Sequence, residues 1–214
     1  SDIIAHYLLN NGTDEQKRRW LPGMVSGECV GAIGMTEPGA GSDLQNIRTH
    51  AKRAPADDGW LVNGSKIFIT NGQHADLVVT AVKTDPSVPG SKGTSLLLID
   101  TRADGFRRGR NLDKIGMHAG DTSELFFDDV FVPDDAVLGG LGEGFRIMMR
   151  ELPRERLVLG LGGVGAMAGA LDWTRNTEDE DDVPVDAEAR RSALRTSYLE
   201  GVLVLGVTRM GSPT

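Results

Sequence analysis

Residues 58–70 read DGWLVNGSKIFIT, and this stretch decides the fold class of the chain. Two short apolar runs, Trp60–Val62 and Lys66–Thr70, each follow a dipeptide typical of tight turns, Asp58-Gly59 and Asn63-Gly64. These residue types tolerate the positive φ angles that two-residue hairpin turns require. The stretch therefore predicts strands joined by a hairpin at each dipeptide.

The same pattern of short apolar runs separated by turn residues extends over residues 27–133. No pattern of helical length interrupts it, so alternating strand–helix–strand units are disfavoured. The regular spacing predicts an antiparallel sandwich or barrel. The other runs of this kind are Cys29–Met35, Leu77–Val82, Ser95–Ile99 and Glu124–Val132.

Helical patterns precede this region. Thr13 stands three residues before Gln16, which is the spacing of a capping box, and predicts a helix from about Asp14 to Val25. Residues Ile3–Leu9 read as the end of an earlier helix.

A second helical region follows Gly139-Gly140. Apolar residues on helical spacing predict a helix to about Trp173, broken or kinked near Pro153. The acidic run Glu178–Asp182 predicts a solvated loop, and a last helix is expected at about Ala187–Arg209. The predicted class is α+β, with a strand-rich middle domain (27–140) between partial helical domains (1–26 and 141–214).

Composition excludes several classes of protein. The 214 residues contain 31 acidic and 23 basic side chains, for a net charge of −8, which disfavours a nucleic-acid binder. The single cysteine, Cys29, rules out an internal disulfide and indicates a reducing compartment, so we expect a cytoplasmic protein. Residues 1–6 lack the features of a signal peptide, and the apolar stretch Leu157–Leu171 is shorter than the roughly 18 residues of a membrane span. The histidines show no metal-binding spacing, so no metal is expected.

The first candidate for chemistry is residues 35–43, MTEPGAGSD, called the glycine loop below. Gly39 and Gly41 allow a sharp turn and a close approach of backbone to a ligand, while Thr36 and Ser42 supply hydroxyl groups. Backbone amides exposed in this way can bind an anionic or heteroaromatic group without a formal positive charge. An ordinary glycine- and proline-containing loop is the alternative interpretation.

The second candidate is Glu155, within the charged stretch ELPRERLV at 151–158. A buried glutamate can act as a general base because burial raises its pKa. The alternative is an exposed ion pair with neighbouring charges. Residues 160–165, GLGGVG, also match a dinucleotide-binding pattern, but no strand–helix–strand unit surrounds them, and small residues at helical spacing more often allow close helix packing.

Three motifs in order resemble the acyl-CoA dehydrogenases, flavoenzymes with a β-domain between two helical domains. They are the glycine loop, NGSKIFITNG at 63–72 and ELFFDDVFVP at 124–133. Residues 12–22 look like the end of that family's N-terminal helical domain, and the resemblance extends to about residue 175. It implies a fragment of such an enzyme.

The resemblance implies FAD as cofactor and assigns roles by position. Phe68 stands where the family often has a tryptophan beside the flavin, and Thr70 would bond near flavin N5. Glu155 matches the base of isovaleryl- and long-chain-type members, followed by Arg156. The implied cofactor-binding residues are Ile33, Met35, Thr36, Gly41, Ser42, Phe68, Ile69 and Thr70, and the implied substrate-binding residues are Ser42, Ser91 and Arg156.

The implied activity is FAD-dependent α,β-dehydrogenation of an acyl-CoA thioester. Electrons would leave to an electron-transfer flavoprotein, and the family resemblance implies a homo-oligomer, a tetramer. Two alternatives stay open: a non-catalytic or truncated module that packs against a full-length partner, and a relative such as an acyl-CoA oxidase.

Overall fold

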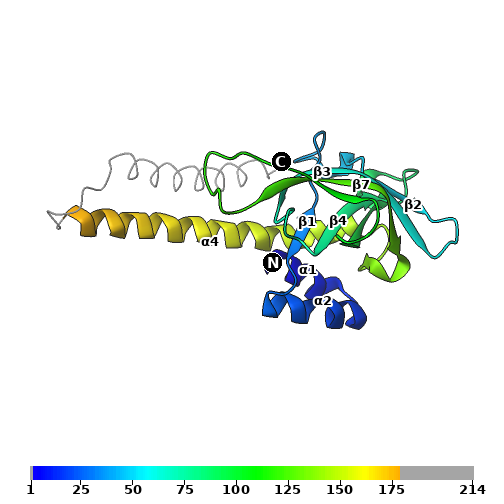
Figure 1. Cartoon of the computed structure of the whole chain (residues 1–214), viewed down its shortest axis with the longest axis horizontal. Helices are drawn as coiled ribbons and strands as arrows, with labels where there is room; N and C mark the ends of the chain where they lie inside the picture. The colour runs from blue at the N-terminus through cyan, green and yellow to red at the C-terminus, as the bar shows by residue number, and fades with distance from the viewer. Residues whose placement is uncertain (1, 179–214) are drawn as a thin grey trace, which may run out of the picture. The chain divides into compact units, whose positions relative to one another are not determined.

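A computed structural model of the chain describes residues 2–178, and its main feature is one eight-stranded sheet (Figure 1). The chain divides into two units, Ser1–Glu151 and Leu152–Thr214, which are described separately. In chain order the elements are α1 (Asp2–Asn11), α2 (Asp14–Ser26), β1 (Gly31–Gly34), η1 (Leu44–Asn46), β2 (His50–Arg53), β3 (Gly59–Thr70), β4 (Leu77–Lys83), α3 (Gly90–Gly93), β5 (Thr94–Asp100), β6 (Phe106–Asn111), β7 (Thr122–Pro133), η2 (Asp134–Ala136), β8 (Val137–Leu138) and α4 (Gly144–Glu178).

The sheet runs in the order β6-β7-β3-β2-β4-β5-β8, with β1 pairing to β4 outside this path. This arrangement confirms the predicted α+β class with a strand-rich middle. Five of the seven strand pairs are antiparallel, whereas β1–β4 and β2–β4 are parallel, so the sheet is mixed rather than purely antiparallel as predicted. Within the described residues the terminal strands β6 and β8 do not pair with each other, so the sheet stays open.

The core of the first unit lies at β4 and β5, the strands predicted at Leu77–Val82 and Ser95–Ile99. Each is buried at six consecutive positions, and the two pair in antiparallel register from Leu77 opposite Asp100 to Lys83 opposite Thr94. Burial on both faces explains why these runs are continuously apolar rather than alternating. Helix α1 packs against β1 at the edge of this core, as Figure 1 shows.

The two hairpin predictions have different outcomes. A hairpin does join β2 to β3, but its turn lies at residues 54–58, with positive φ at Asp57 rather than at Asp58 or Gly59, and Gly59 is already the first residue of β3. The predicted hairpin at Asn63-Gly64 is wrong, because β3 runs through it as one strand with a register shift there.

Gly64 marks a bulge in β3 rather than a turn. It has φ +142°, and a Cβ at this position would lie 2.6 Å from Oγ1 of Thr49. Asn63 pairs across the bulge with Asp129 of β7, donating from Nδ2 at 2.7 Å and accepting from the Asp129 N–H at 3.1 Å. The turn-forming residues thus adapt two long strands to each other.

The helix predictions before the sheet are confirmed. Helix α2 begins at Asp14, and Thr13 and Gln16 form the expected capping box. The Nε2 group of Gln16 also donates to the carbonyl oxygens of Asp135 and Val137, at 2.7 and 3.0 Å, which fixes α2 to η2 and to the start of β8. Helix α1 covers the segment predicted as the end of an earlier helix.

Helix α4 is continuous through Pro153, so it does not break there, and the alternative of a kink stays a prediction. A proline inside a helix removes one backbone hydrogen bond, and the remaining bonds of a long helix persist around it. The glycine-rich residues 160–165 lie within α4 and not in a strand–helix–strand unit, while their expected role in close helix packing stays a prediction. Glu178 ends the described helix instead of starting a loop. The rest of the acidic run, the predicted last helix and the proposed domain limits are not tested by the described residues.

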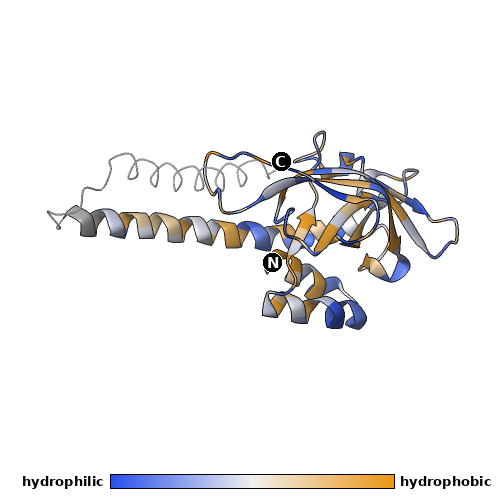
Figure 2. Ribbon diagram, viewed as in Figure 1, coloured by the Kyte–Doolittle hydropathy of each residue, from blue (hydrophilic) through white to orange (hydrophobic). Residues whose placement is uncertain are grey.

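Apolar residues recur along α4, as Figure 2 shows. Its segment Gly144–Thr174 contains an 18-residue window of mean hydropathy 1.3, long and apolar enough to cross a membrane by length and composition. Only 6% of that window is buried, and its length contradicts the expectation that the apolar stretch is too short for a membrane span. The absence of a membrane span stays a prediction.

Candidate functional site

The glycine loop follows β1 directly and closes on itself. The backbone N–H of Glu37 donates to the Ala40 carbonyl at 2.9 Å, and the N–H of Ala40 donates back at 3.1 Å. Gly39 and Gly41 are exposed, and a Cβ at either would meet no atom within 4 Å. The tip of the loop therefore borders open space, as a backbone surface that receives a ligand requires.

The base of the loop is bonded to β3. The Thr36 carbonyl accepts from the N–H of Ile67 at 2.9 Å, and the Met35 carbonyl accepts from Nζ of Lys66 at 3.1 Å. Met35 is buried, whereas Thr36 is half-buried. The structure thus joins the two segments that the sequence analysis assigns to the cofactor, the glycine loop and residues 68–70.

Phe68 adopts an unusual backbone conformation at the end of this connection. Its φ is +61°, and 63% of the residue is exposed. The β3–β7 register shifts between Lys66 and Ile69, so Phe68 lies in a bulge. A bulky residue with positive φ is a genuine outlier, and such strain concentrates at functional sites. Ile69, by contrast, is 2% exposed and belongs to the core.

Sequence reasoning missed a buried ion pair beneath the loop. Nζ of Lys66 lies 2.8 Å from Oε1 of Glu37, with side-chain exposures of 0% and 5%. The carboxylate also accepts from the N–H groups of Arg48 at 2.5 Å and Thr49 at 3.0 Å. One signal was present in the sequence, since the glycine loop carries the acidic residues Glu37 and Asp43 and the motif at 63–72 carries the oppositely charged Lys66.

The ionisation of this pair reflects its surroundings. Burial lowers the pKa of Lys66 to about 8, although the charge of Glu37 opposes this shift. Burial acts to raise the pKa of Glu37, but the charge of Lys66 and the hydrogen bonds to the carboxylate outweigh it and hold the pKa below its ordinary value. Near neutral pH both groups are therefore charged.

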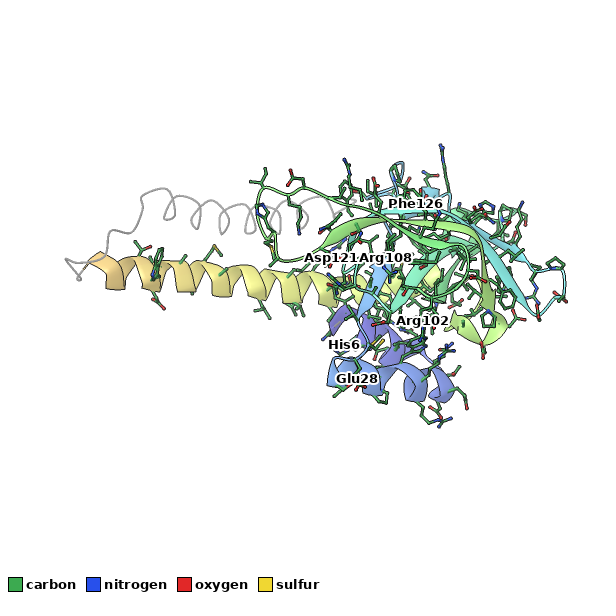
Figure 3. All side chains as sticks on the ribbon, viewed as in Figure 1. His6, Glu28, Arg102, Arg108, Asp121 and Phe126 are labelled. Atoms are coloured by element: carbon green, nitrogen blue, oxygen red, sulfur yellow. The ribbon has the colours of Figure 1, made fainter. Side chains whose placement is uncertain are left out.

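The chain beyond Thr70 is held by the neighbouring β6–β7 region (Figure 3). Oδ2 of Asp121 accepts from the N–H of Gln73 at 2.6 Å. The guanidinium of Arg108 donates to the Ala75 carbonyl at 2.8 Å. Thr70 itself is exposed, at the end of β3.

The predicted substrate residues Ser42 and Ser91 lie on segments that the fold brings together. Ser42 precedes η1, and Ser91 lies on α3, where Gly90 packs so closely on the Gln45 carbonyl that a Cβ would overlap it. Ile33 is half-buried on β1.

Glu155 and Arg156 belong to the second unit, which begins at Leu152. Glu155 is half-buried and Arg156 is exposed on α4. Their roles as base and substrate contact stay predictions.

Two further features of the described residues bear on the location of the site. A cleft of about 280 Å³ is lined by residues of α2, β5 and β7, including Trp20, Asp100 and Phe131, but by none of the predicted site residues. No group of three or more histidine, cysteine or acidic residues in the described chain could hold a metal ion.

Comparison with known proteins identifies the family. Residues 32–130 match the model of the acyl-CoA dehydrogenase middle domain, and residues 1–28 match that of the acyl-CoA dehydrogenase N-terminal domain. This chain belongs to the acyl-CoA dehydrogenase family. The family membership predicted from the three sequence motifs is confirmed.

Other acyl-CoA dehydrogenases are similar over most of the chain. The mitochondrial long-chain specific enzyme of Mus musculus is 48% identical over 177 residues, covering 82% of this chain and 41% of the relative. Mitochondrial isovaleryl-CoA dehydrogenase of Solanum tuberosum is 43% identical over 172 residues, covering 80% and 41%. The crystal structure of acyl-CoA dehydrogenase from Geobacillus kaustophilus gives a TM-score of 0.80 at 43% identity, covering 97% of this chain and 55% of that one. This acyl-CoA dehydrogenase chain thus spans 41% of the length of these two curated relatives.

Proposed function

We propose that this chain supplies the cofactor- and substrate-binding part of an enzyme that introduces an α,β double bond into an acyl-CoA thioester, with FAD as cofactor. One observation carries the proposal. Phe68, which is exposed and has a strained backbone, directly follows Ile67, whose N–H donates to the Thr36 carbonyl of the glycine loop. The family relationship supports the same function. A similar acyl-CoA dehydrogenase from Bacillus anthracis, with a TM-score of 0.75 at 29% identity, is described as complexed with FAD.

The residues of the glycine loop fit a flavin ring. The loop exposes backbone and hydroxyl groups rather than cationic side chains, which suits an uncharged ring system that carries carbonyl groups. Thr36 and Met35 would contact the pyrimidine side of the ring, with Ile33 behind them. Gly41 and Ser42 would contact the pyrophosphate and the CoA portion of the substrate.

The strand side of the site would complete this arrangement. The exposed ring of Phe68 would cover one edge of the flavin as an apolar wall, and the hydroxyl of Thr70 would bond near N5. Ile69 would hold this segment in place from the core, because it is buried. When bound, FAD supplies a two-electron acceptor for the hydride that leaves the β-carbon.

Glu155 would remove the α-proton of the thioester as a general base. A carboxylate in a dry pocket has its pKa raised toward the working pH, which makes proton removal efficient. Ser42, Ser91 and Arg156 would orient the CoA thioester.

The proposed electron acceptor is an electron-transfer flavoprotein. One similar chain, 34% identical with a TM-score of 0.77, comes from a structure described as the electron transferring flavoprotein of Acidaminococcus fermentans. Assembly into a homo-oligomer and a cytoplasmic location stay predictions.

The test uses the purified full-length protein. It should be yellow, and anaerobic addition of acyl-CoA thioesters of several chain lengths should bleach the flavin absorbance with at least one of them. A colourless protein that does not take up added FAD would contradict the proposal and favour the non-catalytic module.

A further inference from the structure

The buried pair of Lys66 and Glu37 has no role in the chemistry proposed above. Burying two charges is expensive, and replacing such a pair by apolar residues of similar volume is often neutral or stabilising. Glu37 belongs to the glycine loop and Lys66 to β3 at the base of that loop, and their charged groups lie 2.8 Å apart and almost fully buried. Its retention there is poorly explained by stability alone.

Lys66 makes a second contact, to the backbone at the base of the glycine loop. Its Nζ donates to the Met35 carbonyl at 3.1 Å. In a trans peptide unit the C=O and the following N–H point in opposite directions, and the chain contains no cis peptide bond in its described part. The N–H of Thr36 therefore points away from Lys66.

The Thr36–Glu37 peptide unit helps to fix the orientation of the Met35–Thr36 peptide unit. The Thr36 carbonyl accepts from the Ile67 N–H at 2.9 Å, so both carbonyls at the base of the loop are bonded to β3. A cation bonded to a carbonyl polarises its peptide unit and makes the N–H on the opposite side a stronger donor. The Thr36 N–H thus becomes a donor supported by a buried positive charge.

Glu37 keeps that charge in place. Its carboxylate accepts from Lys66 and from the backbone N–H groups of Arg48 and Thr49. These contacts hold the lysine head group beneath the Met35 carbonyl without placing a charged side chain in the open space above the loop.

We propose that Lys66 is a positioning residue for the flavin, which acts through the Met35–Thr36 peptide to strengthen the hydrogen bond from the Thr36 N–H to a flavin carbonyl, and that Glu37 holds Lys66 in position. This inference rests on the proposed function. A stronger donor to that carbonyl stabilises the electron-rich reduced ring more than the oxidised ring, so Lys66 raises the reduction potential of bound flavin.

The test compares two single variants that break the same ion pair, Lys66→Met and Glu37→Gln. The readouts are the dissociation constant for FAD and the reduction potential of the bound flavin in the full-length protein. Lys66→Met should bind FAD about tenfold more weakly and lose about tenfold in its preference for reduced over oxidised flavin, which is about 30 mV for a two-electron couple. Glu37→Gln removes the charge that opposes the lowering of the Lys66 pKa, so more of Lys66 becomes neutral and the potential should also fall. Its difference from the wild type should shrink as the pH is lowered, whereas that of Lys66→Met should not.

Controls separate this role from a purely structural one. Lys52→Met and Glu28→Gln remove exposed charges outside the pair and should match the wild type in both readouts. If Lys66→Met does not fold, the double variant Lys66→Met/Glu37→Gln replaces it, since it leaves no unpaired buried charge. A potential of Lys66→Met equal to that of the wild type overturns the inference, as does a potential difference that follows pH in the same way in the lysine and glutamate variants. Wild-type protein that binds no FAD overturns the proposed function itself, and the inference with it.

Discussion

The carbonyl oxygen of Thr36 accepts a hydrogen bond from the backbone N–H of Ile67 at 2.9 Å. This bond joins two segments that are thirty-one residues apart in the sequence and that each carry half of the proposed flavin site. Because Phe68 follows Ile67 directly, the position of the aromatic ring depends on the position of the loop. Changes on either side of the bond are therefore expected to affect cofactor binding.

The backbone conformation of Phe68 should lower the stability of the fold, while its ring should strengthen the binding of FAD. Glycine tolerates the φ of +61° at this position, whereas alanine does not, so Phe68→Gly should be more stable than Phe68→Ala by about 1 kcal/mol. Both variants remove the ring and should retain FAD less well than the wild type. Urea unfolding of the FAD-free proteins and FAD titration measure the two effects. Unchanged FAD retention in both variants would argue against the placement of Phe68 beside the flavin.

Glu155→Gln should separate cofactor binding from catalysis. The amide cannot accept the α-proton, so the variant should keep the flavin spectrum and lose at least about 10²-fold of the rate of bleaching by acyl-CoA, the lower range for general-base catalysis. Anaerobic stopped-flow absorbance measures this rate. The control is Glu143→Gln. Glu143 lies just before α4, is partly exposed and pairs with Arg146, so this variant should bleach normally. Normal turnover by Glu155→Gln would place the base elsewhere.

Two glycine substitutions should have opposite effects on stability and on ligand binding. Gly64→Ala forces a Cβ against Thr49 at a φ of +142° and should destabilise the fold by about 1–3 kcal/mol. Gly41→Ala adds its Cβ in open space and should leave the free energy of unfolding within about 0.5 kcal/mol, while weakening the binding of FAD or acyl-CoA. Denaturant unfolding and ligand titration distinguish them. A Gly41→Ala protein with wild-type binding of both ligands would contradict the role of the loop.

The Lys66–Glu37 pair should make stability depend on pH. The pKa of Lys66 is about 8 in the folded chain against an ordinary value of 10.5, so between these values the unfolded chain binds more protons. The free energy of unfolding of the wild type, relative to Lys66→Met/Glu37→Gln, should therefore rise as the pH increases through this window. In acid, the pKa of Glu37 is lower in the folded chain than its ordinary value of 4.5. The ionised carboxylate therefore contributes stability that is fully present above pH 4.5 and is lost as the pH falls through the pKa of Glu37 in the folded chain.

Urea unfolding at a series of pH values measures this difference directly. Other groups titrate in both proteins and cancel in the comparison. A difference in the free energy of unfolding that stays constant between pH 8 and 10.5 would show that burial does not lower the pKa of Lys66.

The strongly apolar strands could be predicted from the sequence, but two polar ones could not. Residues 77–82 and 95–99 are buried on both faces, and their continuous apolar runs reveal them. β2 and β6 read HAKR and FRRGRN, with little apolar character and mostly exposed or half-exposed positions. Only pairing with β3 and β7 makes these segments strands, and pairing is not visible in local sequence.

The sequence by itself determined the family, the glycine loop and the helix cap at Thr13, because each depends on residue types at short spacing. Tertiary structure alone decided that Asn63-Gly64 forms a bulge, that Phe68 is exposed while Ile69 is buried, and that Lys66 meets Glu37 beneath the loop. These outcomes depend on the register between strands far apart in the chain. A shift of one residue exchanges the two faces of a strand, and no short stretch of sequence specifies that register.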